Sequence, residues 1–278
     1  MNIPVLPDTQ YLPELNSFLA GSSIDRDRIH VKRSGDASSE RMLACEWVGL
    51  RALEESGEVS VPTVYGLFSD RGSVCLVMDR VRRGSGSGAV YREAGAMLAR
   101  MHRSTPCDAA GFEHDNFIGL GRQNNGWVDS WPRFFAERRI SPQVEQARST
   151  GLLERSDELA CERLCARMEE ILPDTEAMSL LHGDLWSGNV IPGDDERAYF
   201  IDPAVYYGHR EADLAMTRLF GGFPAAFYDA YEREWPLLSG SEERVPVYNL
   251  YHLLNHLNIF GPSYRSSVRS VLKSFSGA

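Results

Sequence analysis

The stretch LLHGDLWSGNV, residues 180–190, decides the fold class of this 278-residue chain. Four residues separate Asp184 from Asn189, which is the D-x-x-x-x-N spacing of the catalytic loop of protein kinases. In such a loop the aspartate meets the accepting hydroxyl, and the asparagine oxygen suits Mg²⁺, which prefers hard oxygen ligands. The apolar run AYFID, residues 198–202, predicts a strand that presents Asp202 at its tip. The pattern therefore predicts phosphoryl transfer, with Asp184 as the catalytic base and Asn189 and Asp202 as metal ligands.

Two charged residues upstream complete this chemistry. Lys32 lies in the alternating run IHVKR, residues 29–33, and its side chain is expected to reach the α- and β-phosphates of ATP. Glu46 lies on the helix predicted to follow and is placed to hold Lys32 by an ion pair. His182, beside Asp184, is expected to brace the loop by hydrogen bonding rather than to act as an acid.

A place for adenine is expected where the N-terminal sheet ends. The run CLVMDRV, residues 75–81, is apolar and ends just before RRGSGSG, residues 82–88. The backbone of Asp79 and Val81 is therefore predicted to pair with adenine. The Gly/Ser run is interpreted as a hinge or linker, because it lacks the spaced glycines and lysine of a phosphate-binding loop.

Periodicity divides the chain into two lobes around this linker, which predicts an α+β fold. Residues 1–81 are expected to form a small antiparallel sheet with one helix, and residues 89–278 a mostly helical lobe. The expected strands are LNSFLAG (15–21), DRIHVKR (27–33), TVYGLFS (63–69) and SVCLVMD (73–79), with a helix over 37–57. Further helices are expected over 89–104, 129–140, 156–172 and 243–261, with short strands at 189–191 and 198–202.

The composition disfavours a nucleic-acid-binding, a disulfide-rich and a membrane-spanning protein. A net charge of −10 disfavours a nucleic-acid partner, because such proteins usually carry a basic surface. The five cysteines are an odd number without a framework spacing, which favours reduced thiols. The N-terminus has no signal-peptide pattern, and no run of 18 apolar residues predicts a membrane helix. A cytoplasmic location is expected, and the oligomeric state is left open.

Three longer segments carry a family resemblance. LLHGDLWSGNV, FIDPAVYYGHREADLAMTRLFGGFP (200–224) and YNLYHLLNHLNIFGPSY (248–264) resemble the fructosamine/ketosamine kinase family, one of the aminoglycoside-phosphotransferase-like kinases. The resemblance implies a bilobal protein-kinase-like fold with ATP and Mg²⁺ as cofactors. It also implies that the acceptor is a hydroxyl, with C3 the expected position, of a ketosamine such as fructosamine or ribulosamine. The substrate is then a small ketosamine or a glycated protein.

The resemblance assigns further roles. Trp186 resembles an apolar wall for the sugar, although a packing role fits it as well, and Glu211 and Asp213 resemble a motif that braces the catalytic loop. The chain departs from the family where Pro13 and Glu14 stand in place of paired glycines in the first hairpin, just before Asn16. A second departure is His209, where an acidic residue is common.

The same residues allow several alternatives to this interpretation. An aminoglycoside- or choline-type phosphotransferase keeps the chemistry and changes the acceptor, and a nucleotide-binding pseudokinase would explain the altered hairpin. A protein-serine kinase is disfavoured, because Pro203 and Ala204 follow Asp202 where a DFG switch needs Phe and Gly. His252 and His256 are one helical turn apart, but Leu253 replaces the glutamate of a zinc protease motif.

Overall fold

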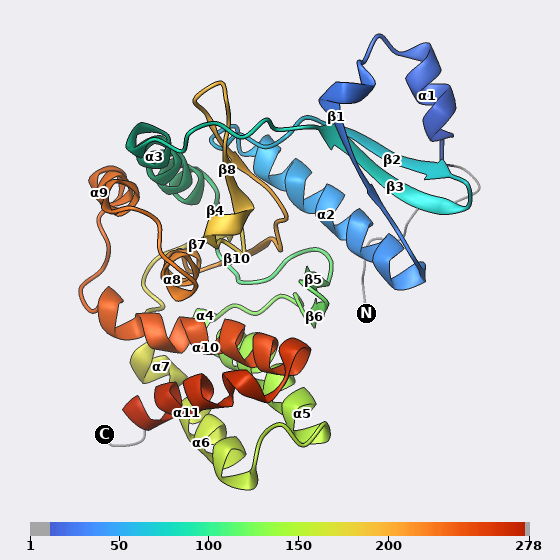
Figure 1. Ribbon diagram of the computed structural model, residues 1–278. Helices are drawn as coiled ribbons and strands as arrows, with labels where there is room; N and C mark the ends of the chain where they lie inside the picture. Colours follow the sequence, from blue (N-terminus) through green and yellow to red (C-terminus); the bar gives the residue numbers. More distant parts are fainter. Residues whose placement is uncertain (1–11, 276–278) are drawn as a thin grey trace.

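The computed structural model describes residues 12–275 and consists of an N-terminal antiparallel sheet with helices, followed by a mostly helical part (Figure 1). The N-terminal elements are α1 (Leu15–Gly21), the 3₁₀ turn η2 (Arg26–Arg28), β1 (Ile29–Arg33), α2 (Ala37–Glu55), β2 (Val64–Asp70) and β3 (Ser73–Asp79). We call residues 80–87, which join β3 to the helical part, the connector.

The segment 15–21 is a helix, so the prediction of a strand there was wrong. Leu15, Phe18 and Leu19 follow the i, i+3, i+4 spacing of a helix face, and all three pack against the sheet. The Phe18 ring lies 4.5 Å from the Phe68 ring, centroid to centroid. The N-terminal sheet of the described residues consequently has three strands in the order β1-β3-β2, with β1 at one edge.

The two faces of this sheet are covered by different helices. Successive side chains of a strand alternate between faces, and α1 covers the face that carries Ile29 and Val77. Helix α2 packs on the opposite face through Leu43 and Leu50 against Leu76 and its neighbours. An Asp36 capping box begins α2, which matches the predicted helix closely.

The helical part carries the remaining elements. Up to the catalytic loop these are α3 (Gly88–Ser104), β4 (Pro106–Cys107), β5 (Asn116–Ile118), β6 (Gly121–Gln123), α4 (Trp131–Phe134), the π-helix η3 (Phe135–Ile140), α5 (Ser141–Ser149), α6 (Arg155–Ala166), α7 (Met168–Ile171) and β7 (Met178–Leu181). Beyond it come η4 (Ser187–Asn189), β8 (Val190–Pro192), β9 (Ala198–Phe200), β10 (Tyr206–Gly208), α8 (Glu211–Leu219), α9 (Ala225–Glu234), α10 (Ser241–Phe260), η5 (Pro262–Tyr264) and α11 (Arg265–Ser274). The strands of this part form three small sheets ordered β10-β7-β4, β5-β6 and β8-β9 among the described residues.

The predicted helices of this part are found with small changes. The 129–140 segment changes from α to π geometry within its length, and the 156–172 segment breaks at Arg167 into α6 and α7. Helix α3 packs against α9 at Gly95, where any Cβ would collide with the backbone of Phe227. None of the helices within residues 12–275 is both long and apolar enough to span a membrane.

Candidate active site

The predicted catalytic loop connects β7 to β8, and its local geometry follows from the spacing of Asp184 and Asn189. The Asn189 amide donates to the backbone carbonyl of Asp184 at 2.8 Å and to its carboxylate at 3.3 Å. Burial raises the pKa of Asp184 from 3.8 to about 7, and the charges of Asp202 and Asp213 act in the same direction. A carboxylate with this pKa is suited to accept a proton near neutral pH.

Asp213, on α8, supports the loop by hydrogen bonds to its backbone. Its carboxylate accepts the backbone N–H groups of His182 at 2.7 Å and Gly183 at 2.9 Å. Burial alone would raise the pKa of Asp213, but His102, 3.1 Å away, helps to hold that pKa below its ordinary value. The His182 ring lies 3.0 Å from the carbonyl of Ile201, so it ties the loop to the segment before Asp202.

Lys32 faces α2 because of its position in β1. It pairs with Leu76 in the register, which places its side chain on the face of the sheet that α2 covers. Its ammonium contacts Glu46 at 2.6 Å and also the carboxylate of Asp202. Burial works against the charge, yet the two carboxylates raise the pKa of Lys32 above its ordinary value. Lys32 is therefore a charged group at neutral pH.

Asp202 has backbone φ of +53°, which is uncommon for a residue other than glycine. Such strain is often found at functional sites, where the surrounding structure maintains it. Pro203 follows and packs against Gly49 of α2, 3.0 Å from where a Cβ would stand. The two parts of the chain therefore meet closely beside Asp202.

One cavity of about 340 Å³ brings most of the predicted site residues together. Its walls include Lys32, Glu46, Asp184, Asn189, Asp202 and Trp186. His182 and Asp213 lie beneath the loop and are buried. Asp79 and Val81 do not line this cavity; they line a second one of about 660 Å³.

The oxygen donors of this cavity fit Mg²⁺. Because Asn189 donates its amide nitrogen to Asp184, its amide oxygen is left as an acceptor, and the Asp202 carboxylate already binds one cation, the Lys32 ammonium. Mg²⁺ usually binds one or two protein oxygens together with substrate phosphates and water. No cluster of three or more His, Cys, Asp or Glu side chains suited to a metal occurs within residues 12–275.

Trp186 forms one exposed wall of the cavity. Its side chain is 40% exposed, and its ring lies so close to Gly188 that a Cβ there would collide with it. Phe117 and Gly119, from the β5–β6 hairpin, form another part of the wall. We did not predict this hairpin from the sequence, although the turn residues Gly119-Leu120 between short runs are a hairpin signal.

Pro13, Glu14 and His209, at which the chain departs from the family pattern, lie in two different environments. Pro13 accepts a hydrogen bond from Ser69, and Glu14 pairs with Ser69, so both lie beside β2, at the opposite edge of the sheet from Lys32. Helix α1 follows them, so within the described residues they do not belong to a hairpin beside Lys32. His209 is buried with its Nε2 3.2 Å from Glu176, which supplies an acidic partner from another segment.

A family model described as fructosamine kinase matches residues 20–276. The chain belongs to the fructosamine kinase family. The ketosamine-3-kinase of Mus musculus is 32% identical over 288 residues, covering 92% of this chain and 91% of the mouse protein. The chloroplastic protein-ribulosamine 3-kinase of Arabidopsis thaliana is 35% identical and covers 84% of this chain and 72% of its own length.

Solved structures agree with this family. A candidate fructosamine-3-kinase from Thermobifida fusca superimposes with a TM-score of 0.81 at 34% identity, covering 88% of this chain and 84% of that one. An aminoglycoside phosphotransferase superimposes with a TM-score of 0.58 at 16% identity, which shows the shared kinase-like fold. This fructosamine kinase family member is thus a phosphotransferase that acts on a sugar hydroxyl, and its family implies the use of ATP.

Proposed function

We propose that this chain transfers the γ-phosphoryl group of ATP to the C3 hydroxyl of a ketosamine, such as a fructosamine or ribulosamine. The observation that carries the proposal is the gathering of Lys32, Asp184, Asn189 and Asp202 around one cavity. The acceptor is a free ketosamine or a glycated protein, and the reaction begins the removal of sugar from the amine.

Each of these four residues has a proposed role. Lys32, oriented by Glu46, binds the α- and β-phosphates, since positioned charge is the main source of catalysis in phosphoryl transfer. Asp184 orients the C3 hydroxyl and accepts its proton. Asn189 and Asp202 would hold Mg²⁺, which, when bound, neutralises charge on the phosphates.

The nucleotide and the sugar approach this cavity from different sides in the proposal. The backbone of Asp79 and Val81 pairs with adenine, and residues 1–81 form a nucleotide-binding lobe. Residues 82–88 act as the hinge to a lobe formed by residues 89–278. Trp186 packs against the apolar face of the sugar, and its exposed position leaves room for an amine carrier of variable size.

The chemistry after transfer explains the choice of C3. A phosphate at C3 is on the carbon next to the C2 carbonyl and β to C1, so loss of a C1 proton gives a 1,2-enaminol from which phosphate leaves C3 and an imine forms at C1. Water then hydrolyses the remaining imine, which frees the amine from a dicarbonyl sugar fragment. These steps need no protein residue, so we assign none to them.

Release of ADP from Mg-ATP across a panel of acceptors tests the proposal. The panel contains ribulosyl-lysine, fructosyl-lysine, an aminoglycoside and choline. We expect turnover with the two ketosamines. Turnover with the aminoglycoside or choline alone would favour the small-molecule phosphotransferase, and nucleotide binding without any turnover would favour a pseudokinase.

A further inference from the structure

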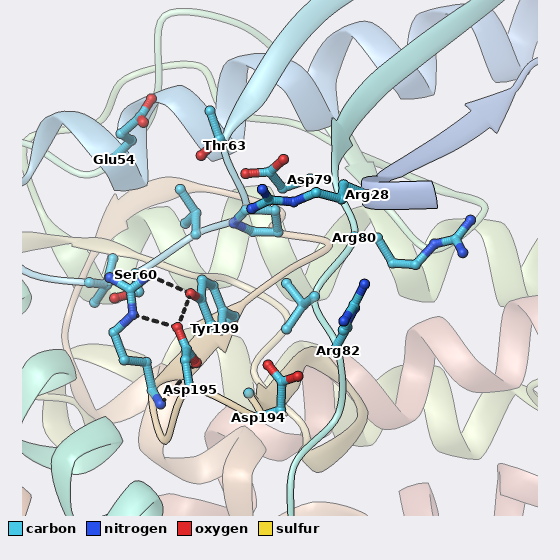
Figure 2. A pocket seen from close by; sticks show the side chains of 16 residues that line it. Arg28, Glu54, Ser60, Thr63, Asp79, Arg80, Arg82, Asp194, Asp195 and Tyr199 are labelled. Atoms are coloured by element: carbon cyan, nitrogen blue, oxygen red, sulfur yellow. Dashed lines mark hydrogen bonds and ion pairs between the residues drawn. The ribbon is translucent and has the colours of Figure 1, made fainter. Parts of the chain in front are cut away.

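Asp79 and Val81, whose backbone is proposed to pair with adenine, also line the second cavity, but the other side chains in its walls have no role in the proposed reaction. This cavity has a volume of about 660 Å³ and lies between three segments: the loop 59–63 after α2, residues 79–82 at the end of β3, and the β8–β9 turn at 193–195 (Figure 2). We call it the rear cavity. Its walls come from both parts of the chain, and none of the proposed catalytic or metal-binding residues lines it.

The register of the sheet places Asp79 of the rear cavity and Lys32 of the catalytic cavity on opposite faces. Asp79 is paired with Ile29, so these two side chains lie on the same face of the sheet. Ile29 and Lys32 are three positions apart in one strand and therefore lie on opposite faces. The Asp79 carboxylate in the rear cavity thus points away from the Lys32 ammonium.

Unpaired arginines distinguish the rear cavity. Arg28, Arg80 and Arg82 line it, and within residues 12–275 none of them forms an ion pair with a carboxylate. Figure 2 shows the Arg28 side chain extending across the cavity beside Asp79, and Arg82 rising from the connector. Arg80 points outward in the same view, so Arg28 and Arg82 are the cations available to a ligand.

Two of the acidic groups in the walls already have partners. The Asp79 carboxylate accepts the Tyr65 hydroxyl at 2.8 Å. The Asp195 carboxylate binds the Arg197 guanidinium at 2.9 Å and the Tyr199 hydroxyl at 2.7 Å. Arg197 compensates the charge of Asp195, whereas the Tyr65 hydroxyl donates to Asp79 without neutralising it. Arg28 and Arg82 form no ion pair among residues 12–275 and can attract an anion.

The remaining groups suit a hydroxylated ligand. Ser60 and Thr63 provide hydroxyls, and the carboxylates of Glu54 and Asp194 can accept hydrogen bonds from sugar hydroxyl groups. Arginine is well matched to phosphate, because its guanidinium donates two parallel hydrogen bonds. The volume lies in the range of small-molecule sites. We propose that the rear cavity binds a phosphorylated sugar through Arg28 and Arg82.

Calorimetry on the full chain tests this proposal directly. Ribose 5-phosphate and fructose 6-phosphate are titrated with Mg-ADP present at saturation, so that the nucleotide site is occupied. Ribose and inorganic phosphate, titrated separately, show whether the sugar or the phosphate alone suffices. We expect the sugar phosphates to bind and each fragment to bind at least tenfold more weakly, because a charged hydrogen-bonded contact contributes about a factor of ten or more.

Variants locate the binding. Arg28→Gln with Arg82→Gln should weaken sugar phosphate binding at least tenfold, whereas Arg92→Gln, an exposed arginine on α3, should leave it unchanged. Circular dichroism and thermal unfolding confirm that the variants fold, and Arg82→Gln alone replaces the pair if the double variant does not. No binding by the wild-type chain at millimolar sugar phosphate, or equal binding by the folded variants, would overturn the proposal. Neither result depends on kinase turnover, so the proposed reaction is judged separately.

Discussion

Asp184→Asn should stabilise the protein while abolishing its activity. The carboxyl is disfavoured as an anion in the folded chain, because burial raises its pKa from 3.8 to about 7. Each pH unit of such a difference corresponds to about 1.4 kcal/mol, which sets an upper limit of about 4 kcal/mol on the cost of ionising Asp184. Solvent at the cavity mouth reduces this cost, and we expect the variant to gain about 2 kcal/mol at pH 8.

The sign and the pH range follow from linkage. The unfolded chain loses the Asp184 proton near pH 4, whereas the folded chain retains it until about pH 7. The free energy of unfolding of the wild-type chain therefore falls as the pH rises from about 4 to about 7. Above pH 7 the ionisation of Asp184 lowers it no further. The asparagine variant cannot ionise and keeps an acceptor for the Asn189 amide, so its advantage grows from pH 4 to pH 7 and then levels off.

Urea unfolding without nucleotide or metal, at pH 4.5, 6 and 8, measures this difference. The control is Asp129→Asn, an exposed carboxylate whose removal should not produce the same pH dependence. In parallel, kcat/KM of the wild-type enzyme should fall about tenfold per pH unit below about pH 7, since the base must be ionised. A variant no more stable than wild type at pH 8, or one that still turns over, would refute the reasoning.

Three further substitutions test the other roles. Asp202→Ala should abolish turnover and weaken Mg²⁺-dependent nucleotide binding, whereas Asp184→Asn should leave Mg-ATP binding nearly intact; equal loss of binding in both would contradict this division. Lys32→Met should slow transfer by a factor of about 10²–10³, and Glu46→Gln should cost less because Glu46 only orients Lys32; a near-normal kcat and ATP KM in Lys32→Met would show that the assignment is wrong. Trp186→Ala should raise the KM for the ketosamine and leave the KM for ATP unchanged, as measured by initial rates with each substrate varied; an unchanged ketosamine KM would favour a packing role.

The catalytic loop could be predicted from the sequence because its geometry is local. Asp184 and Asn189 are five positions apart, so one turn of chain fixes their hydrogen bond. Lys32 and Glu46 are further apart in the sequence. Strand alternation places Lys32 on the face of the sheet that α2 covers, and Glu46 on α2 faces it there. The structure places these residues together; their roles stay proposals.

Other features depend on contacts that spacing does not reveal. His102 and Asp213 meet across 111 positions of the chain, so no local pattern could indicate that His102 supports the loop. The run LNSFLAG is too short for periodicity to separate helix from strand, and packing of Phe18 on Phe68 decided it. The expected cytoplasmic location also stays a prediction.

The identity and fate of the product test the central claim most directly. Ribulosyl-lysine or fructosyl-lysine is incubated with the enzyme and Mg-ATP, the enzyme is removed by filtration, and the products are followed by phosphorus NMR and mass spectrometry. We predict a 3-phosphate that then releases free lysine and inorganic phosphate in the absence of enzyme. A phosphate held stably at another hydroxyl, with no lysine released, would contradict the account.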